Sequence, residues 1–442
     1  MGLISAMIQT YIGNKLSQDN LRKLQTKRLR KLVNYAKGNS LYFRELYEDI
    51  DEEFTLENLP ITNKIEMMKN FDNWVTDSNI NLERVKEFTS DIENVGRMID
   101  NKYLIFKTSG STGNPAIVLY DKKNIDVASA VAALRTFARK EDLKKFMKNG
   151  KRTAGVFANY GFYLACGMSR YLQLKMPKKR NKITIDVNMD ENKIIKELND
   201  FNPAMLSGYP SNLFLLSNFN ELTIKPNIVI TGGELLTDEI REKLTNKFNC
   251  YVQTHYSCTE VGEIACECSE KHLHINEDFV IVEPVDKNNN SVGYGVLSDK
   301  VLITCLSNYI QPFIRYELTD RVIVHNERCK CGKKTCWLEI EGRTDEVLEF
   351  GNGVSIAPMS FYKILSEVEG VIRFQLLQKS HQKLEVRLIA DEKEKIFEKI
   401  KDKLQEFLNS KNVFNIDIVL SEELPQVNKI SGKYKHVYKN FE

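Results

Sequence analysis

Long hydrophobic runs are absent from this 442-residue sequence, and so are the signals that would send it into or across a membrane. No apolar stretch approaches the roughly 20 residues that a membrane-spanning helix needs. The first residues lack the basic segment and cleavage site of a signal peptide, and Ala6 stands where a myristoylation signal has Ser or Thr. We therefore expect a cytoplasmic protein without a membrane span.

A large excess of charge is also missing, because 63 basic and 60 acidic residues leave a net charge of +3. Nucleic-acid-binding proteins usually carry a broad basic surface, so no nucleic-acid partner is expected. One basic run lies in residues 19–37, where apolar residues recur at helical spacing. The run indicates either contact with an anionic surface or, as is usual for such runs, the solvated face of an outer helix.

A regular disulfide pattern is missing as well, since the nine cysteines are odd in number and unevenly spread. Two segments, 266–274 and 329–336, combine cysteine and histidine, which are soft ligands that suit tetrahedral Zn²⁺. Buried free cysteines are the other interpretation. We expect a closed structural zinc site whose ligands are Cys268, His274, Cys329 and Cys331. Alternate ligands are Cys266, His272 and Cys336.

The order of predicted elements indicates an α/β protein of more than one unit. Residues 155–248 alternate strands and helices, which predicts layered α/β sheets with ligands beyond the carboxyl ends of the strands. A helix capped by Asn124 and ending near Lys140 precedes them. Short strands follow from residue 279 and predict a small β subdomain. The last 95 residues or so predict a small α+β domain. Because no low-complexity linker separates the units, we expect a short hinge.

Residues 108–115 (TSGSTGNP) lie between two short predicted strands and combine four hydroxyl side chains with two glycines. Glycines allow close approach of the backbone, and the hydroxyls and amides can donate to phosphate oxygens. The Gly-Lys-Ser/Thr of a Walker loop does not follow. The loop therefore predicts either a phosphate site of another kind or a polar hairpin turn.

Five further stretches follow in order. They are TGGE at 231–234, THYSCTEVG at 254–262, PFIRYELTD at 312–320, EGRTD at 341–345 and, near the end, ISGKY at 430–434. Together with the loop, they resemble the adenylate-forming superfamily of acyl- and aryl-CoA synthetases. The length, the opening segment and the Cys-x-Cys-Gly insert are most similar to the group of phenylacetate-CoA ligase, coenzyme F390 synthetase and CapK.

The resemblance implies an N-terminal body over residues 1–343, with the β subdomain at about 279–340, and a small mobile C-terminal domain over 344–442. It implies that ATP activates a carboxylic acid to an acyl-adenylate with release of pyrophosphate, followed by transfer to coenzyme A. A carrier-protein thiol or an amine is the alternative acceptor. A nucleotide-binding scaffold without catalysis is the competing class, against which the intact Glu260, Asp320 and Lys433 argue. The partners expected are the acid and the acceptor, and a homodimer is allowed.

The resemblance also implies the role of each motif residue. Lys433 would be the catalytic lysine, Thr259 would direct a hydroxyl at the phosphates, Glu260 would hold Mg²⁺, and Asp345 would be the hinge. The nucleotide would be bound by Thr108, Ser109, Gly110, Ser111, Thr112, Gly113, Gly233, Glu234, Tyr256, Asp320 and Arg343. Ala116 after Pro115 departs from the family loop, which usually has a lysine there.

The acid pocket is expected among aromatic and polar residues near the strand ends. Its candidate residues are Asn159, Tyr160, Phe162, Tyr209 and His255. Aromatic side chains in such segments are more often ordinary core. A flat aryl or arylacetic acid is expected on the family resemblance, which carries most of that expectation.

Overall fold

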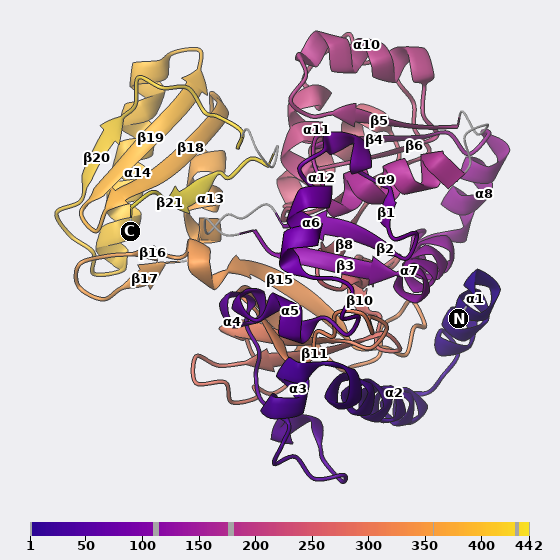
Figure 1. Ribbon diagram of the computed structural model, residues 1–442. Coiled ribbons are helices and arrows are strands. Elements are labelled where there is room, and N and C mark those ends of the chain that lie inside the picture. Colours follow the sequence, from indigo (N-terminus) through magenta and orange to yellow (C-terminus); the bar gives the residue numbers. More distant parts are fainter. Residues whose placement is uncertain (1, 109–114, 176–180, 357, 429–432, 442) are drawn as a thin grey trace.

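The structure is a computed structural model that describes residues 2–108, 115–175, 181–356, 358–428 and 433–441. A large body is followed by a smaller C-terminal unit, which lies to one side of it in Figure 1. No helix in these ranges is long and apolar enough to cross a membrane. The mixed α/β architecture agrees with the predicted fold class.

A nine-stranded sheet forms the centre of the body, in the order β14-β15-β10-β9-β8-β7-β6-β4-β5. Strands β5, β4, β6, β7 and β8 are parallel, and the strands from β8 to β14 pair antiparallel. The parallel strands are β4 (Thr153–Phe157), β5 (Lys182–Asp186), β6 (Met205–Gly208), β7 (Ile228–Gly232) and β8 (Tyr251–Cys258). The antiparallel strands are β9 (Gly262–Glu267), β10 (Leu273–Ile275), β14 (Asp320–His325) and β15 (Trp337–Arg343).

Helices follow the parallel strands as the alternating pattern predicts. They are α9 (Leu164–Lys175), α10 (Glu191–Phe201), α11 (Pro210–Ser217) and α12 (Asp238–Phe248). Leu198, Leu213 and Leu244 from three of these helices are fully buried in one core with Val156 and Val229 of the sheet. Burial of such side chains stabilises each helix against the sheet by about 1.5–3 kcal/mol per residue. The carboxyl ends of β6 and β7 are thereby fixed beside the starts of α11 and α12.

Two three-stranded sheets complete the body, and both share a second core with the N-terminal helices. One contains β1 (Met98–Ile99), β2 (Tyr103–Lys107) and β3 (Ile117–Asp121), and the other β11 (Val280–Val285), β12 (Lys300–Cys305) and β13 (Tyr316–Leu318). The longer helices here are α1 (Leu3–Gly13), α2 (Gln18–Asn39), α7 (Lys122–Arg135) and α8 (Lys140–Lys148). Shorter ones are α3 (Leu41–Leu46), η1 (Leu56–Asn58), α4 (Lys64–Lys69), α5 (Phe71–Trp74), α6 (Leu82–Phe88) and η2 (Ile92–Asn94).

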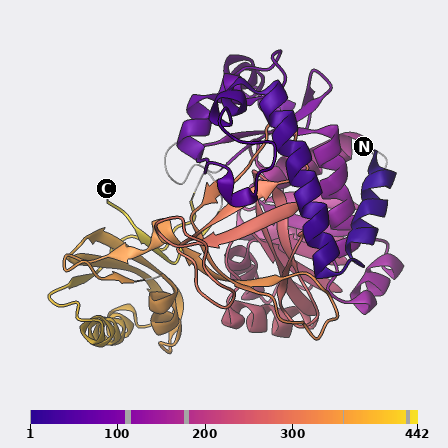
Figure 2. The ribbon, with the colours of Figure 1, turned by 90° about the horizontal axis from the view of Figure 1, so that it is seen from below.

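The C-terminal unit has a core of its own, drawn from residues 348–437. Its four-stranded sheet has the order β20-β19-β18-β21. These strands are β18 (Val371–Ser380), β19 (Lys383–Ala390), β20 (Asp417–Leu420) and β21 (Val437–Lys439), accompanied by α13 (Pro358–Ser366) and α14 (Lys393–Ser410). The pair β16 (Leu348–Glu349) and β17 (Ser355–Ile356) and the turn η3 (Thr344–Glu346) connect the unit to β15. Figure 2 shows the same separation from below.

Three details differ from the sequence-based expectations. Helix α7 is capped by Asp121, which accepts a hydrogen bond from the Asn124 amide, and the expected cap Asn124 is buried inside the helix. The buried Asn124 Oδ1 instead accepts from Ser307 Oγ at 2.8 Å. Helix α7 also ends at Arg135, and residues 140–148 form a separate helix. Strands β14 and β15, expected within the β subdomain, extend the nine-stranded sheet, while β11, β12 and β13 form a separate sheet.

Candidate functional site

The hydroxyl-rich loop is closed at its base by one residue pair. The Thr108 amide donates to the Ala116 carbonyl at 3.0 Å, and the Ala116 amide donates to Thr108 Oγ1 at 2.8 Å. The pair continues the antiparallel register of β2 and β3. Ser109, Gly110, Ser111, Thr112 and Gly113 lie outside the described residues. The described part is therefore a hairpin that presents this loop between two buried strands.

Gly233, directly after β7, lies close to the C-terminal unit. Its φ is +79°, which favours glycine, and a Cβ there would lie 3.0 Å from the Tyr209 ring and 3.6 Å from Lys433 Cε. Tyr209, at the start of α11, packs edge-on against Phe157 with 5.3 Å between ring centroids. The absence of a side chain at residue 233 thus leaves the space that Tyr209 and Lys433 share.

Glu234 joins the body to the C-terminal unit. Its Oε1 accepts from the Tyr434 amide at 2.9 Å, and its Oε2 accepts from the Ser211 amide at 3.1 Å. Burial raises the pKa of Glu234, while these hydrogen bonds and the charge of Lys433 oppose the rise. We call Gly233, Glu234, Tyr209 and Lys433 the lysine–glutamate junction.

Lys433 is the cation of this junction. Its Nζ lies 5.9 Å from the centre of the Tyr209 ring, within the range of a cation–π contact. Burial lowers the pKa of Lys433, the Glu234 charge opposes this, and Arg343 lowers the pKa further. The lysine is thus placed in a partly dry site with a carboxylate beside it, unlike an ordinary lysine of a solvated tail.

Tyr256, Asp320 and Arg343 form a second group, close enough to the junction for the charges of Arg343 and Asp320 to act on Lys433. The Tyr256 hydroxyl donates to Asp320 Oδ2 at 2.9 Å, and burial raises the pKa of this buried tyrosine. Asp320 and Arg343 are register partners across β14 and β15, and Arg343 Nη2 donates to Thr319 Oγ1 at 2.7 Å. The ring, the carboxylate and the guanidinium are therefore neighbours, as a clamp for a nucleoside requires.

Glu260 is buried behind the tyrosine. It accepts a hydrogen bond at 3.2 Å from the hydroxyl of Tyr316, a residue of the 312–320 motif to which the sequence argument gave no role. Burial raises the pKa of Glu260. The preceding Thr259 is held through its carbonyl, which accepts from Tyr120 Oη at 3.0 Å. A single carboxylate suits Mg²⁺, which usually keeps few protein ligands and takes others from substrate phosphates.

The five candidate pocket residues have different surroundings. Tyr209 belongs to the lysine–glutamate junction. Asn159 is tied to the sheet through the Thr184 carbonyl at 3.2 Å, and the buried Phe162 packs in the main core. Tyr160 is 71% exposed and is not packed into the body.

His255, the last candidate, has a defined hydrogen-bonding environment. Gln253 Nε2 lies 2.9 Å from its Nε2, and Glu263 Oε2 lies 3.5 Å from its Nδ1. Burial acts to lower the pKa of His255, but the Glu263 carboxylate, the hydrogen bond with the Thr136 carbonyl and the Glu267 charge together outweigh it, so the pKa is raised. Glu263 was not predicted, although its place three residues after Glu260 is a signal that could have found it.

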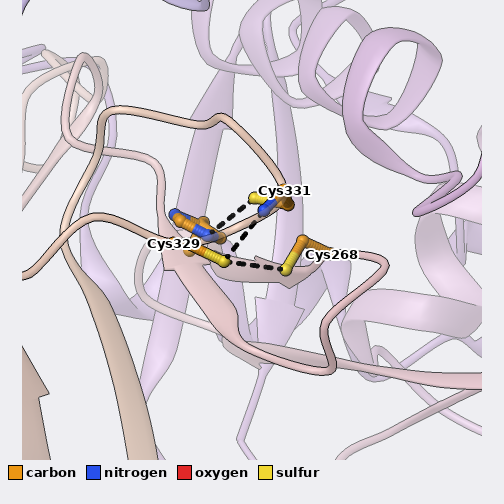
Figure 3. A group of neighbouring side chains, drawn as sticks. Cys268, Cys329 and Cys331 are labelled. Atoms are coloured by element: carbon orange, nitrogen blue, oxygen red, sulfur yellow. Dashed lines mark hydrogen bonds between the residues drawn. The ribbon is translucent and has the colours of Figure 1, made fainter.

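The four predicted zinc ligands come together at one point. One donor atom of each lies within 4.8 Å of those of the others, and we call Cys268, His274, Cys329 and Cys331 the Cys/His cluster. Figure 3 shows the three cysteines converging from two segments about sixty residues apart in sequence. Cys268 Sγ lies 3.7 Å from Cys329 Sγ, and Cys331 Sγ lies 3.3 Å from His274 Nε2.

The surroundings of the cluster residues suit the binding of a metal ion. His274 Nδ1 lies 3.0 Å from the Thr335 carbonyl, which leaves Nε2 directed at the sulfurs, the arrangement usual for a metal-bound histidine. Burial lowers the pKa of His274 to about 4 and raises the pKa of Cys331 to about 12. A neutral imidazole is what a metal needs, whereas the thiols must lose their protons when it binds. Three of the four donor atoms are sulfur, which favours Zn²⁺ over Mg²⁺.

The alternate ligands have other surroundings. Cys266 is buried and groups with His255 and Glu263. Cys336 Sγ accepts from Gln18 Nε2 at 3.7 Å. His272 Nδ1 lies 3.3 Å from Cys329 Sγ, so it touches the cluster from outside, and its ring stacks on Trp337 at 3.8 Å.

The predicted hinge Asp345 lies in η3, between β15 and β16. Beyond it, Tyr362 of α13 contacts the body: its hydroxyl donates to Glu239 Oε2 at 3.0 Å and lies 3.5 Å from Thr237 Oγ1. Tyr362 and Glu239 are 123 residues apart, so no sequence signal could have paired them. Together with the Tyr434–Glu234 bond, this contact attaches the C-terminal unit to α12 and the loop before it.

Comparisons with known proteins find similar sequences and structures, although no family model matches the chain. Protein CapK of Staphylococcus aureus is 24% identical over 429 residues, which cover 91% of this chain and 86% of CapK. A phenylacetate-coenzyme A ligase of Thermus thermophilus is 24% identical over 382 residues, which cover 81% of this chain and 78% of the relative.

Among solved structures, 2-hydroxyisobutyryl-CoA ligase in the postadenylation state with R3-HIB-AMP matches with a TM-score of 0.70 at 15% identity, over 97% of this chain and 91% of that one. The same ligase in the thioesterification state, with 2-HIB-AMP and CoA, covers equal shares at 14% identity with a TM-score of 0.58. The chain is thus similar in sequence to CapK and the phenylacetate-CoA ligases, and it has the fold of 2-hydroxyisobutyryl-CoA ligase.

Proposed function

We propose that this chain is an AMP-forming acid–thiol ligase, which activates a carboxylic acid with ATP to an acyl-adenylate and then transfers the acyl group to coenzyme A. The observation that carries the proposal is the lysine–glutamate junction. Lys433 reaches from the C-terminal unit to the carboxyl end of β7, where α/β sheets bind their ligands. A lysine brought from a separate unit to this place supplies a cation where charge develops on the α-phosphate.

The remaining motif residues have roles in holding the nucleotide. Tyr256 stacks on the adenine, and Asp320, whose carboxylate accepts from the Tyr256 hydroxyl, binds the ribose hydroxyls. Arg343 supports the ribose or phosphates from the next strand, and Gly233 and Glu234 border the adenine. The loop 108–113 binds the β- and γ-phosphates together with Thr259.

Glu260 holds Mg²⁺, which neutralises charge on the phosphates when bound. The burial that raises the pKa of Glu260 disfavours its charge in the absence of a cation. Tyr316 orients this carboxylate through its hydrogen bond at 3.2 Å.

The acid is an aryl or arylacetic acid, a substrate class supported by the relative named phenylacetate-coenzyme A ligase. Tyr209 borders its pocket at the junction, while His255 and Phe162 lie deeper in the body. Asn159 positions the segment through its bond to β5. Tyr160 would have to move from its exposed position to contribute.

A structural Zn²⁺ in the Cys/His cluster fixes the segment after β9 to the loop before β15. The donor set, the convergence within 4.8 Å and the orientation of His274 fit the ion. None of the four ligands is among the residues assigned to the nucleotide, so the ion has no part in the chemical steps. The cytoplasmic location and the homodimer remain expectations.

A second acceptor class is supported by the match with CapK over 91% of the chain. In that alternative, the acyl group passes to a carrier-protein thiol or an amine in natural-product or capsule biosynthesis. The two alternatives share the adenylation half-reaction and differ only in the second.

ATP–pyrophosphate exchange with a panel of aryl, arylacetic and aliphatic acids tests the proposal. We expect exchange that depends on one acid class and on Mg²⁺, followed by a thioester when coenzyme A is added. Exchange without thioester would favour another acceptor. Absence of exchange with every acid, in folded protein that binds ATP, would favour the scaffold alternative.

A further inference from the structure

Helix α1 turns apolar side chains toward solvent, the reverse of the pattern expected of a surface helix. Its buried stripe is made of Ala6, Thr10 and Gly13. On the opposite side, Ile4, Ile8 and Tyr11 are 76%, 55% and 53% exposed. No residue of this helix is charged. An exposed apolar face of this kind marks a surface that is covered by something else.

The helix is fixed to the body, so its outward face is a permanent part of the surface. Arg135 of α7 lies buried beneath it and forms two hydrogen bonds of 2.8 Å with the Asp278 carboxylate. The same guanidinium donates to Asn14 Oδ1 at 2.8 Å and to the Thr10 carbonyl at 3.4 Å. Because Arg135 holds the end of α1, the exposed isoleucines belong to an anchored helix.

The neighbouring helix α2 presents cations. Its exposed basic residues are Arg22, Lys23, Lys27, Arg30 and Lys31. Residues 1–44 contain nine basic residues and one acidic residue, Asp19, while the rest of the chain has 54 basic and 59 acidic residues. Figures 1 and 2 both place α1 and α2 side by side at one edge of the molecule. A helix with an exposed apolar face and a helix with exposed basic residues are thus neighbours in a chain that is otherwise slightly acidic.

We propose that α1 and α2 dock this chain on an anionic lipid surface, where the face of Ile4, Ile8 and Tyr11 enters the headgroup region and the α2 cations meet lipid phosphates. Amphipathic helices with basic neighbours bind membranes in this way, lying on the bilayer without crossing it. A second copy of the chain is the less suitable occupant, because pairing two such edges would bring two basic α2 faces together. Charge complementarity therefore selects the lipid.

Co-sedimentation with vesicles tests this docking without reference to catalysis. The full chain is expected to bind vesicles of phosphatidylglycerol and phosphatidylcholine, to bind pure phosphatidylcholine weakly, and to be released by high salt. The double variant Ile4→Glu/Ile8→Glu is expected to lower binding by about tenfold or more, since charge replaces apolar contact. Ile65→Glu is the matched control, because Ile65 is 79% exposed on α4.

The charge contribution is tested separately with Lys27→Glu/Arg30→Glu, which should weaken binding to anionic vesicles and flatten its salt dependence. Lys399→Glu/Lys403→Glu on α14 changes the same charge at another exposed surface and should bind like the wild type. Thermal unfolding of every variant establishes that it is folded. Absence of binding to anionic vesicles, or equal losses in the controls, would overturn the proposal. A dimer that Ile4→Glu/Ile8→Glu converts to monomers, without vesicle binding by the wild type, would overturn it too.

Discussion

The Cys/His cluster and the lysine–glutamate junction both join segments far apart in the sequence, but they are built differently. In the cluster, four donor atoms converge within 4.8 Å, and all four residues belong to the body. In the junction, Lys433 comes from the C-terminal unit, while Glu234 and Tyr209 come from the ends of body strands. The donor atoms of the cluster converge at one point within the body. The contacts of the junction instead connect the body with the C-terminal unit, and each of these has its own core.

This difference indicates which contact can be broken and restored during turnover. A closed metal site is stable because it keeps all its ligands. Among the described residues, the contacts between the C-terminal unit and the body include single hydrogen bonds from Tyr434 and Tyr362, each worth about 0.5–1.5 kcal/mol. Two half-reactions with different acceptors need such a separable contact. We therefore expect the cluster to govern stability and the junction to govern activity.

Lys433→Ala should have the largest effect. Loss of one preorganised charge at the transition state typically costs about a hundredfold to a thousandfold in rate, so pyrophosphate exchange should fall by that factor while ATP binding persists. Lys439→Ala removes a nearby lysine that pairs with Glu349 and serves as the control. Near wild-type exchange in Lys433→Ala would contradict the assignment.

Cys331→Ser should affect the Cys/His cluster and leave the lysine–glutamate junction unchanged. Even an outer-shell change costs about 10- to 100-fold in metal affinity, so loss of a ligand should remove the single zinc expected per chain. Elemental analysis and thermal unfolding should show lost zinc and lowered stability, with exchange per folded molecule retained. Cys250→Ser, away from the cluster, should keep both. Protein purified without chelators that contains no zinc would end this hypothesis.

Asp345→Pro should separate the two half-reactions. A hinge residue must change φ and ψ, which the proline ring resists, so the enzyme should be held in one arrangement. If the variant is held with Lys433 at the junction, pyrophosphate exchange persists. Thioester formation then falls by about tenfold or more, which corresponds to about 1.4 kcal/mol or more in activation free energy. Equal loss of both activities, with unchanged thermal unfolding, would leave Asp345 an ordinary turn residue.

The pH dependence of exchange should reflect the buried lysine. Lys433 must be charged to act, and burial lowers its pKa, so activity should decline as pH rises through a value below that of a solvent-exposed lysine. Lys433→Arg keeps its charge at much higher pH, so any residual exchange should lose this alkaline decline. If the activity of both proteins declined over the same alkaline pH range, the decline would belong to another group.

Tyr362→Phe should have the smallest effect. It removes the hydroxyl that donates to Glu239 and leaves the ring in place. The arrangement with Lys433 at the junction should thereby lose about 1 kcal/mol of stabilisation. Pyrophosphate exchange should therefore slow by about fivefold or less, which corresponds to a rise of at most about 1 kcal/mol in activation free energy. Tyr438→Phe, within the C-terminal unit, should leave exchange unchanged. A loss as large as that of Lys433→Ala would mean that Tyr362 does more than hold the unit.

The sequence predicted local structure well where one signal was sufficient. The alternation predicted over residues 155–248 is found as parallel strands followed by helices, and the cysteine and histidine types led to the four residues that converge in the cluster. The cap of α7 was wrong because Asp121 and Asn124 can both cap, and the choice depends on Ser307, which lies 183 residues away. The predicted placement of strands was wrong for the same reason, because no local signal assigns β14 and β15 to the nine-stranded sheet.

The candidate site shows the same limit. Motif residues such as Tyr256 and Asp320 could be named from the sequence, but the hydrogen bond between them depends on how β8 and β14 enter one sheet. Tyr316 lay within a quoted motif and had no role until its hydroxyl was seen beside Glu260. Side-chain partners across distant segments follow from packing, which no single-sequence pattern encodes.

Trp337 provides this protein with an optical reporter. Its indole lies between the rings of His272 and His325, at 3.8 and 3.9 Å, and His272 touches Cys329 of the cluster. The sequence has only one other tryptophan, Trp74, which is buried and donates to the Pro312 carbonyl. In a Trp74→Phe background, the emission of a single indole would therefore follow the assembly of the cluster, so that metal loss could be timed separately from unfolding of the body.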